Sequence, residues 1–293
     1  MVTKMDEYKV LVTGSKGQVG AEIVELLKRE GFTVYGYGRD VLDVKNLEQV
    51  ENLMHTVNPN VVIHSAAYTN VDKAESEENI AFSVNAYGTR NIAVASEQIG
   101  AKLVYLSTDF VFDGAEEEPY NEFTSTNPLS VYGKSKLAGE QFVQHFHSRF
   151  FIVRTSWVFG KYGKNFVQTM LQLALRNQPL TVVDDQLGSP TYAHDLAKII
   201  LQLIQTNKFG VYHVSNAGEC SWFDFAEAIF KEANLDVTLT PCKSKDYIQQ
   251  AQRPAYSVLD NMALRINGFQ ELRHWKEALK EYIQINKVDL LGK

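Results

Sequence analysis

The sequence predicts an α/β protein with a doubly wound parallel sheet of the Rossmann type and a smaller carboxyl-terminal α/β lobe. From Lys9 to Arg154, short apolar runs typical of buried strands alternate with helix-permissive segments, as in a parallel sheet joined by right-handed crossovers. A glycine-rich turn follows the first apolar run, and polar residues gather after a later one. In open α/β sheets, binding sites form at the carboxyl ends of such strands.

The composition indicates a globular protein with room for one large core and one smaller lobe. The chain has 293 residues, of which 45% are hydrophobic and 22% are charged. The net charge of -6 is spread without long single-sign blocks, so we do not expect a nucleic-acid surface. No apolar run approaches the roughly 18 residues of a membrane span, and Cys220 and Cys242 form neither a metal motif nor a disulfide framework. We therefore predict a cytoplasmic protein without a membrane partner.

A glycine-rich turn links the first predicted strand, residues 9–12, to a predicted helix over residues 22–29. Gly14, Gly17 and Gly20 stand three apart in this turn. Such glycines let the backbone turn tightly, bring a pyrophosphate to the helix N-terminus and let the helix pack on the strand. The turn predicts dinucleotide binding, although a turn of this kind can also serve only as a connection.

The second predicted strand, residues 33–37, ends where a dinucleotide fold meets the adenosine ribose. A basic side chain there accepts the 2′-phosphate of NADP(H), whereas an acidic one binds the 2′-hydroxyl of NAD(H). Arg39 favours NADPH, the neighbouring Asp40 leaves NADH open, and an ordinary surface arginine is the alternative. Asp43 and Val44 would lie near the adenine in a fold of this type.

The third predicted strand, residues 61–63, follows a predicted helix over residues 50–57 and ends in small side chains. His64 is expected to be structural. Residues 72–99 predict one helical stretch, in which Asn85 is a candidate buried polar residue that ties helix to strand. A coenzyme would need close backbone approach after this strand, at Ala66, Ala67 and Tyr68.

The fourth predicted strand, residues 103–106, brings Ser107, Thr108 and Asp109 to its carboxyl end, where such sheets build their sites. Tyr132 and Lys136 are four apart in a helix-permissive segment, so their side chains would share one helical face. A neighbouring ammonium favours the phenolate, which predicts a lowered pKa for Tyr132 and proton exchange near neutral pH. The alternative is an exposed helix face that happens to present an aromatic residue.

The rest of the chain alternates less regularly. We assign residues 1–160 to a dinucleotide-binding core and residues 161–293 mainly to a substrate-binding lobe, from which some segments return to the core. Ser221 resembles a capping residue that starts a helix ending near Ala233. The other expected strands are 150–153, 180–183, 211–214 and 237–240, and the other expected helices are 165–176, 193–205 and 275–285.

Five motifs occur in the order in which a known family contains them. They are Gly14-x-x-Gly17-Gln18-x-Gly20, Ser107-Thr108-Asp109-Phe-Val-Phe-Asp-Gly114, Tyr132-x-x-x-Lys136, Arg154-Thr-Ser-Trp157 and Gly188-x-Pro190-Thr191. With these motifs the chain resembles, over essentially its whole length, the dTDP-4-dehydrorhamnose reductases of the extended short-chain dehydrogenase/reductase superfamily. The resemblance implies reduction of the 4-keto group of dTDP-4-dehydro-L-rhamnose by NADPH or NADH, giving dTDP-L-rhamnose for cell-surface polysaccharide.

The resemblance also implies roles for individual residues. Tyr132 would donate a proton to the C4 oxygen, and Lys136 would bind the nicotinamide ribose and stabilise the tyrosinate. Thr108 would hydrogen-bond the same oxygen. Asp109 and Trp157 would contact the sugar, although Asp109 could instead cap the following loop and Trp157 could pack between the lobes. The residues that would line the coenzyme are Gly14, Gly17, Gln18, Val19, Gly20, Asp43, Val44, Ala66, Ala67, Tyr68 and Leu106.

Three further expectations concern partners. Arg253 is a candidate for the substrate's pyrophosphate, because a planar guanidinium suits phosphate oxygens. Some relatives bind a metal at a subunit contact, and Glu22 lies where one ligand could come, but no cluster in the sequence demands an ion. A homodimer is left open.

Two other functions stay as alternatives. A sugar-nucleotide epimerase or dehydratase of the same fold would often place an Asp-Glu pair after the threonine, whereas Thr108-Asp109-Phe110 offers only the aspartate. The other alternative is a non-catalytic partner similar to the regulatory subunit of methionine adenosyltransferase. The intact Thr108, Tyr132 and Lys136 argue for an enzyme instead.

Overall fold

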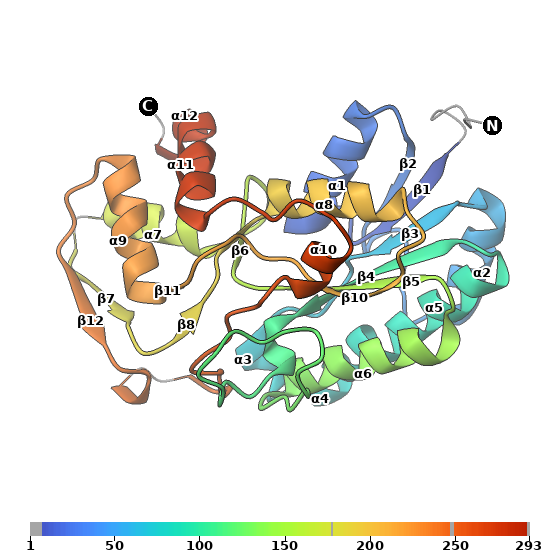
Figure 1. The fold of residues 1–293 in the computed structure, drawn as a ribbon, viewed down its shortest axis with the longest axis horizontal. Coiled ribbons are helices and arrows are strands. Elements are labelled where there is room, and N and C mark those ends of the chain that lie inside the picture. The colour runs from blue at the N-terminus through green and yellow to red at the C-terminus, as the bar shows by residue number, and fades with distance from the viewer. Residues whose placement is uncertain (1–7, 177, 247–248, 292–293) are drawn as a thin grey trace.

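The computed structural model describes residues 8–176, 178–246 and 249–291. Its main sheet consists of β1 (Lys9–Thr13), β2 (Thr33–Tyr37), β3 (Val61–His64), β4 (Lys102–Thr108), β5 (Phe150–Thr155) and β10 (Gly210–His213). All six strands are parallel, in the order β10-β5-β4-β3-β1-β2 (Figure 1). Because β2 lies on one side of β1 and β3 on the other, the order reverses between β1 and β3. The predicted doubly wound fold is confirmed.

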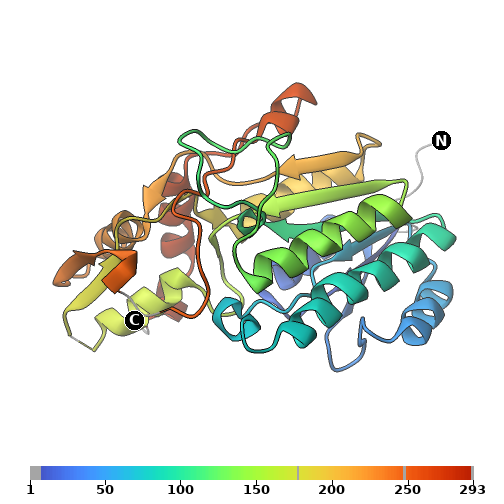
Figure 2. The same cartoon turned by 90° about the horizontal axis from the view of Figure 1, so that it is seen from below.

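Helices cover both faces of this sheet. Side chains of successive residues point to opposite faces, so Val104 packs into one core while Leu103 and Tyr105 pack into the other. Figure 2 shows the second of these helical layers from below. The helices of the first layer are α1 (Gln18–Arg29), α8 (Ala193–Ile204) and α10 (Met262–Ile266), and those of the second are α2 (Leu47–Val57), α5 (Thr89–Gln98) and α6 (Val131–Phe146).

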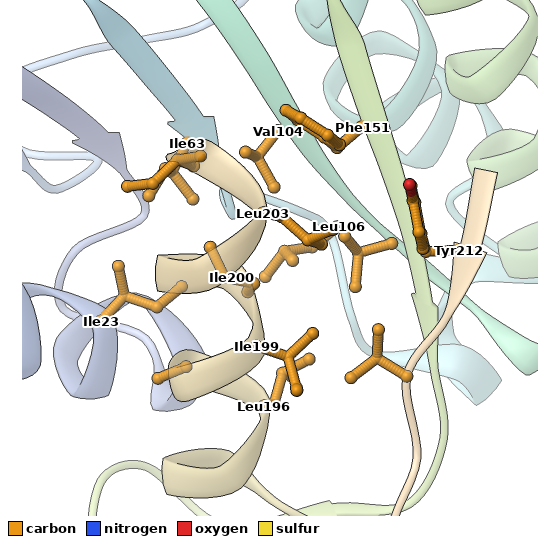
Figure 3. Close-up of a cluster of buried hydrophobic side chains, with 14 of the residues drawn as sticks. Ile23, Ile63, Val104, Leu106, Phe151, Leu196, Ile199, Ile200, Leu203 and Tyr212 are labelled. Carbon is orange, nitrogen blue, oxygen red and sulfur yellow. The ribbon is translucent and has the colours of Figure 1, made fainter. Parts of the chain in front are cut away.

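The core of the first layer shows why α8 belongs to the sheet although it lies late in the chain. Its apolar side chains recur at helical spacing, and Ile200 and Leu203 are fully buried. They point toward Ile63, Val104 and Leu106 on the strands (Figure 3). This packing holds the carboxyl end of β4, where Leu106 lies, against α8.

A second apolar core lies beside the sheet, on the left of Figure 1. Phe225, Trp275 and Tyr282 are buried at its centre. Its helices are α7 (Phe166–Ala174), α9 (Trp222–Ala233), α11 (Trp275–Ile285) and α12 (Lys287–Leu291). Two-stranded ladders border it: β6 (Val158–Phe159) with β9 (Thr191–Tyr192), β7 (Leu180–Val183) with β12 (Leu239–Cys242), and β8 (Leu187–Gly188) with β11 (Cys220–Ser221).

The structure differs from the predicted elements mainly between residues 72 and 99. One helical stretch was expected there, but the chain forms α3 (Val71–Ala74), α4 (Glu78–Phe82), a π-helix (Ser83–Gly88) and α5. The wider π turn contains Asn85, whose buried side chain bonds to groups outside the helix. The predicted strand 237–240 lies two residues later, as β12, and the capping box at Ser221 is confirmed. Short 3₁₀ turns follow β4 and β12, at Asp109–Val111 and Ser244–Asp246.

The helices of the described ranges are short. The longest of them, α6, has 16 residues. None of them combines the length and the apolar character that a membrane crossing requires. Cys220 and Cys242 are both free thiols.

Candidate active site

The glycine-rich turn lies between β1 and α1, at the point where the strand order reverses. Gly14 has φ 64°, a left-handed conformation that favours glycine, and a Cβ there would lie 2.6 Å from the backbone nitrogen of Ala66. A Cβ on Gly20 would lie 2.3 Å from the carbonyl oxygen of Gly14. The Gly17 amide donates to the same oxygen at 2.9 Å. The glycines therefore pack the turn, α1 and the loop after β3 tightly together.

The N-terminus of α1 has the features of an anion site. Gly17 supplies no side-chain cap, and the first turn contains no carboxylate. Its backbone N–H groups and the helix dipole therefore favour a phosphate, which fits the pyrophosphate of a dinucleotide. Gln18 donates from Nε2 to the Val158 carbonyl at 2.8 Å, while its buried Oε1 has no hydrogen-bond partner within the described residues. Val19 is partly buried against the core below the turn.

Two basic residues, Lys16 and Arg39, lie near the end of β2. Lys16 is not among the residues predicted from the sequence. Lys16, from the glycine-rich turn, forms an exposed ion pair with Asp40 at 2.8 Å. Arg39 is exposed next to this pair. Lys16 stands between Gly14 and Gly17 in the sequence, and that position is the signal that could have identified it.

Asp43 and Val44, the two residues predicted to lie near the adenine, differ in their surroundings. Val44 is buried in the core, where its side chain packs against Gly88, so its side chain is already enclosed by protein. The Asp43 carboxylate lies at the surface, accepts from the Lys45 amide at 3.1 Å and pairs with the Lys45 ammonium at 3.4 Å. Of the two residues, only Asp43 presents its side chain to the surface.

The loop after β3 is fixed by Asn85. Its side chain accepts from the Tyr68 amide at 2.7 Å and donates to the Tyr68 carbonyl at 3.0 Å. It also donates to the Ser135 hydroxyl at 2.9 Å. We expect Asn85 to tie helix to strand: its carbonyl accepts from the Tyr105 hydroxyl on β4 at 3.4 Å, while its side chain ties the π-helix to the loop and to α6. Ala66, Ala67 and Tyr68 are partly buried in this loop.

Thr108 and Tyr132 lie together where β4 ends and α6 begins, and Lys136 follows one helical turn later on α6. Ser130 caps α6 by accepting from the Gly133 amide at 3.1 Å, which places Tyr132 in the first turn. The Thr108 hydroxyl is close enough to the Tyr132 phenol to lower its pKa. Lys136 is 3% exposed and donates from Nζ to the Leu106 carbonyl at 2.6 Å.

The pKa predicted for Tyr132 is wrong in direction. Burial raises the pKa of Tyr132 to about 12, with the Thr108 hydroxyl opposing the shift and the Asp109 charge adding to it. Lys136 is not among the groups that shift the pKa of Tyr132; its ammonium bonds to the Leu106 carbonyl and lies 4.1 Å from the centre of the Tyr105 ring. Burial also lowers the pKa of Lys136 to about 7. Tyr132 is therefore a neutral phenol at neutral pH.

Asp109 is a buried carboxyl with one free oxygen. It is 2% exposed, and Oδ1 accepts from the Thr108 hydroxyl at 3.0 Å. Oδ2 is buried without a hydrogen-bond partner in the described part of the chain. Burial raises the pKa of Asp109 to about 6, opposed by the Ser257 and Thr108 hydroxyls. A ligand hydroxyl at Oδ2 would complete its hydrogen bonding.

Trp157 lies where the chain leaves the sheet for the second core. Its φ of 45° is rare for a bulky residue and indicates local strain. Its ring stacks on Trp222 with a centroid distance of 3.5 Å and an interplanar angle of 7°. Gly188 gives the ring space, since a Cβ there would lie 2.5 Å from Trp157 Cε2. Trp222 could not be identified from the sequence, because the two rings are 65 positions apart in the chain.

Arg253 is paired with a carboxylate. Its Nη2 lies 3.0 Å from Oδ2 of Asp72, and its Nη1 lies 3.2 Å from Oδ1. The bond lowers the pKa of Asp72 and joins the carboxyl-terminal loop to α3. A pyrophosphate at Arg253 would have to share or replace this partner.

Glu22 forms a pair as well. Its Oε1 lies 2.8 Å from Nδ1 of His194, so the carboxylate connects α1 to α8. Across the described residues, no three His, Cys, Asp or Glu side chains are grouped so that they could hold a metal ion.

Comparisons with known proteins give a consistent result. The family profile described as "RmlD substrate binding domain" matches residues 8–288. The chain is 42% identical over 276 residues to the Bacillus subtilis (strain 168) "Spore coat polysaccharide biosynthesis protein SpsK", covering 94% of this chain and 97% of that protein. It is 39% identical over 285 residues to the dTDP-4-dehydrorhamnose reductase of Aggregatibacter actinomycetemcomitans, covering 93% and 97%. The crystal structure of dTDP-4-dehydrorhamnose reductase from Bacillus anthracis str. Ames in complex with NADP superposes with a TM-score of 0.94, at 46% identity, over 95% of this chain and 99% of that chain.

Asp109→Asn should change how the free energy of unfolding depends on pH. Since the fold raises the carboxyl pKa from 3.8 to about 6, the folded protein favours the protonated acid and loses stability as pH rises through this window. The free energy of unfolding of the variant minus that of wild type should therefore rise by about 2 kcal/mol from about pH 4.5 to about pH 7.5. Urea unfolding at both pH values measures this gain. Asp236→Asn, at an exposed site, is the control, and a pH-independent difference for Asp109→Asn would contradict the buried acid.

Proposed function

The chain belongs to the dTDP-4-dehydrorhamnose reductase family, and from this premise we propose that it reduces the 4-keto group of dTDP-4-dehydro-L-rhamnose with NADPH to give dTDP-L-rhamnose. The resemblance predicted from the sequence motifs is confirmed. The protein is an NADP-dependent oxidoreductase of dTDP-rhamnose synthesis.

The placement of the Tyr132 phenol in the first turn of α6, close to the Thr108 hydroxyl at the carboxyl end of β4, is the observation that supports the reaction most directly. Reduction of a ketone needs a proton at the oxygen as a hydride reaches the carbon. A phenol with its pKa raised to about 12 holds that proton at neutral pH, beside the Thr108 hydroxyl at the carboxyl end of β4. We therefore propose Tyr132 as the general acid.

Thr108 and Lys136 would act on the charge that develops during proton transfer. The Thr108 hydroxyl would hydrogen-bond the C4 oxygen together with Tyr132 and so share its negative charge. Lys136 is buried four residues after Tyr132 on α6, where a charged ammonium would stabilise the tyrosinate and bind the ribose of the coenzyme. The three side chains would thus form one proton-donating unit.

The uncapped end of α1 and the basic residues near β2 would hold the coenzyme. Backbone amides of Gln18 and Val19, next to Gly17, would bind its pyrophosphate, and Lys16 and Arg39 its 2′-phosphate. When bound, NADPH would supply the hydride. The other residues proposed to line it are Gly14, Gly20, Asp43, Val44, Ala66, Ala67, Tyr68 and Leu106.

The substrate would lie between the sheet and the second core, which we propose as the substrate lobe within residues 161–293. The free oxygen of Asp109 would accept from a sugar hydroxyl, and the stacked Trp157 would offer an aromatic surface to the sugar. Arg253 would reach the pyrophosphate while sharing its guanidinium with Asp72.

We also propose that the enzyme works in the cytoplasm, without a nucleic-acid partner, and that a homodimer is its assembly.

Oxidation of NADPH, followed by its absorbance, tests this function. We expect absorbance to fall with dTDP-4-dehydro-L-rhamnose, whereas the corresponding UDP and GDP sugars serve as controls for the nucleotide. Absence of turnover with the dTDP sugar, in protein that binds NADPH, would favour a regulatory partner over an enzyme. Release of an epimer without net NADPH oxidation would favour an epimerase.

Tyr132→Phe should lower kcat by about 10²–10⁴-fold, because it removes the proton donor without changing the ring. NADPH affinity should stay near that of wild type, as measured by fluorescence titration. Tyr87→Phe, at a tyrosine that is 58% exposed, is the matched control and should leave kcat unchanged. Near-normal turnover in Tyr132→Phe would remove Tyr132 from the mechanism.

Arg39→Ala should weaken NADPH binding by about tenfold or more, because a charged hydrogen bond to phosphate contributes roughly 1.5–3 kcal/mol. NADH binding should change little, since NADH lacks the 2′-phosphate. Calorimetric titration of both coenzymes measures the ratio, with the exposed Arg29→Ala as a control. Equal losses for the two coenzymes would show that Arg39 does not recognise the 2′-phosphate.

A further inference from the structure

A buried ion pair lies next to the proposed catalytic residues and has no part in the mechanism above. Glu140 on α6 is 1% exposed and Arg154 at the end of β5 is 5% exposed. Nη2 of Arg154 lies 2.7 Å from Oε2 of Glu140, and its Nε lies 2.9 Å from Oε1. Arg154 opens the Arg154-Thr-Ser-Trp157 run, which the sequence singled out without a role for its arginine.

Both charges are held by further contacts. Ser107, next to Thr108 on β4, donates to Oε1 of Glu140 at 2.5 Å. Arg154 Nη1 lies 3.3 Å from Nε2 of His213, and its guanidinium lies 5.3 Å from the centre of the Phe112 ring. Burying an ion pair removes two charges from water, and apolar residues of similar volume often give equal stability. Stability alone therefore does not explain why this pair is here.

Glu140 stands one helical turn after Lys136 on α6, so the two side chains lie on the same helical face. We propose that Glu140 and Arg154 are positioning residues for Lys136: the Glu140 carboxylate keeps the Lys136 ammonium charged, and Arg154 with Ser107 holds that carboxylate in place. This inference rests on the proposed reductase, in which the charged ammonium stabilises the tyrosinate.

The groups around Lys136 are consistent with this role. Burial lowers the pKa of Lys136 to about 7, and the charge of Glu140 opposes the shift. On β3, burial lowers the pKa of His64 to about 3, so its ring is neutral. On β4, burial and the Glu140 charge raise the pKa of Tyr105, so it is neutral as well. Three further titratable or charged groups lie at this site: Tyr132, Asp109 and Arg154. The Asp109 charge raises the pKa of Tyr132, and Arg154 is bound to Glu140.

The test is a direct titration of Lys136 in the whole protein without substrate. The protein is labelled with [ε-¹³C]lysine, its signals are followed by NMR as pH changes, and Lys136→Arg identifies the Lys136 signal. In Glu140→Gln the midpoint should fall by about one pH unit or more, because the neighbouring negative charge is lost. Glu140→Asp keeps the charge and should restore most of the midpoint. Glu97→Gln is the control: it removes a carboxylate on α5 that is bound to Ser148 after α6, and it should leave the Lys136 midpoint unchanged.

An unchanged Lys136 midpoint in Glu140→Gln would overturn the proposal. If that variant does not fold, Glu140→Gln is introduced into an Arg154→Met background, and equal Lys136 midpoints in Arg154→Met with and without Glu140→Gln would overturn the proposal. In the active enzyme, the pH at which kcat/KM declines should move in the same direction as the NMR midpoint. Because the NMR readout needs no turnover, a wild-type protein inactive on the dTDP sugar would refute the proposed reductase, whereas an unmoved midpoint would refute only this inference.

Discussion

The ammonium of Lys136 is enclosed by the protein, so the fold itself must replace the water that such a charge needs. It does so with the Leu106 carbonyl at 2.6 Å and the face of the Tyr105 ring, both on β4. Glu140 adds a negative charge from the same helix. The packing of α6 on the carboxyl end of β4 is therefore inseparable from the charge state of the site.

Burial also decides which proton the site can give away. It raises the pKa of Tyr132 and of Asp109 and lowers that of Lys136, so burial shifts each of the three toward its uncharged form. A neutral phenol suits a reductase, which must deliver a proton to a ketone oxygen. The structure thus supports the same chemistry as the sequence did, but for a different physical reason.

Local patterns made much of the fold and part of the site predictable. Apolar runs identified the strands of the sheet, and glycine spacing identified the turn at Gly14. Both were predictable because each pattern is complete within a few consecutive residues of the sequence. Features that depend on distant partners could not be predicted. The direction of the Tyr132 pKa depends on burial, and Arg253 meets Asp72 from 181 positions away. The π-helix contains Asn85, whose side-chain bonds all lie outside its own helix.

The two cores share a chain that passes between them several times. After α7 and β7 in the second core, α8 and β10 return to the sheet, α9 and β12 leave it again, and α10 returns before α11 (Figure 1). No single cut would release the second core as a unit. Exchange of whole modules between genes is therefore a poor route to new specificity in this architecture. Stepwise substitution and loop insertion are the routes that leave both cores intact.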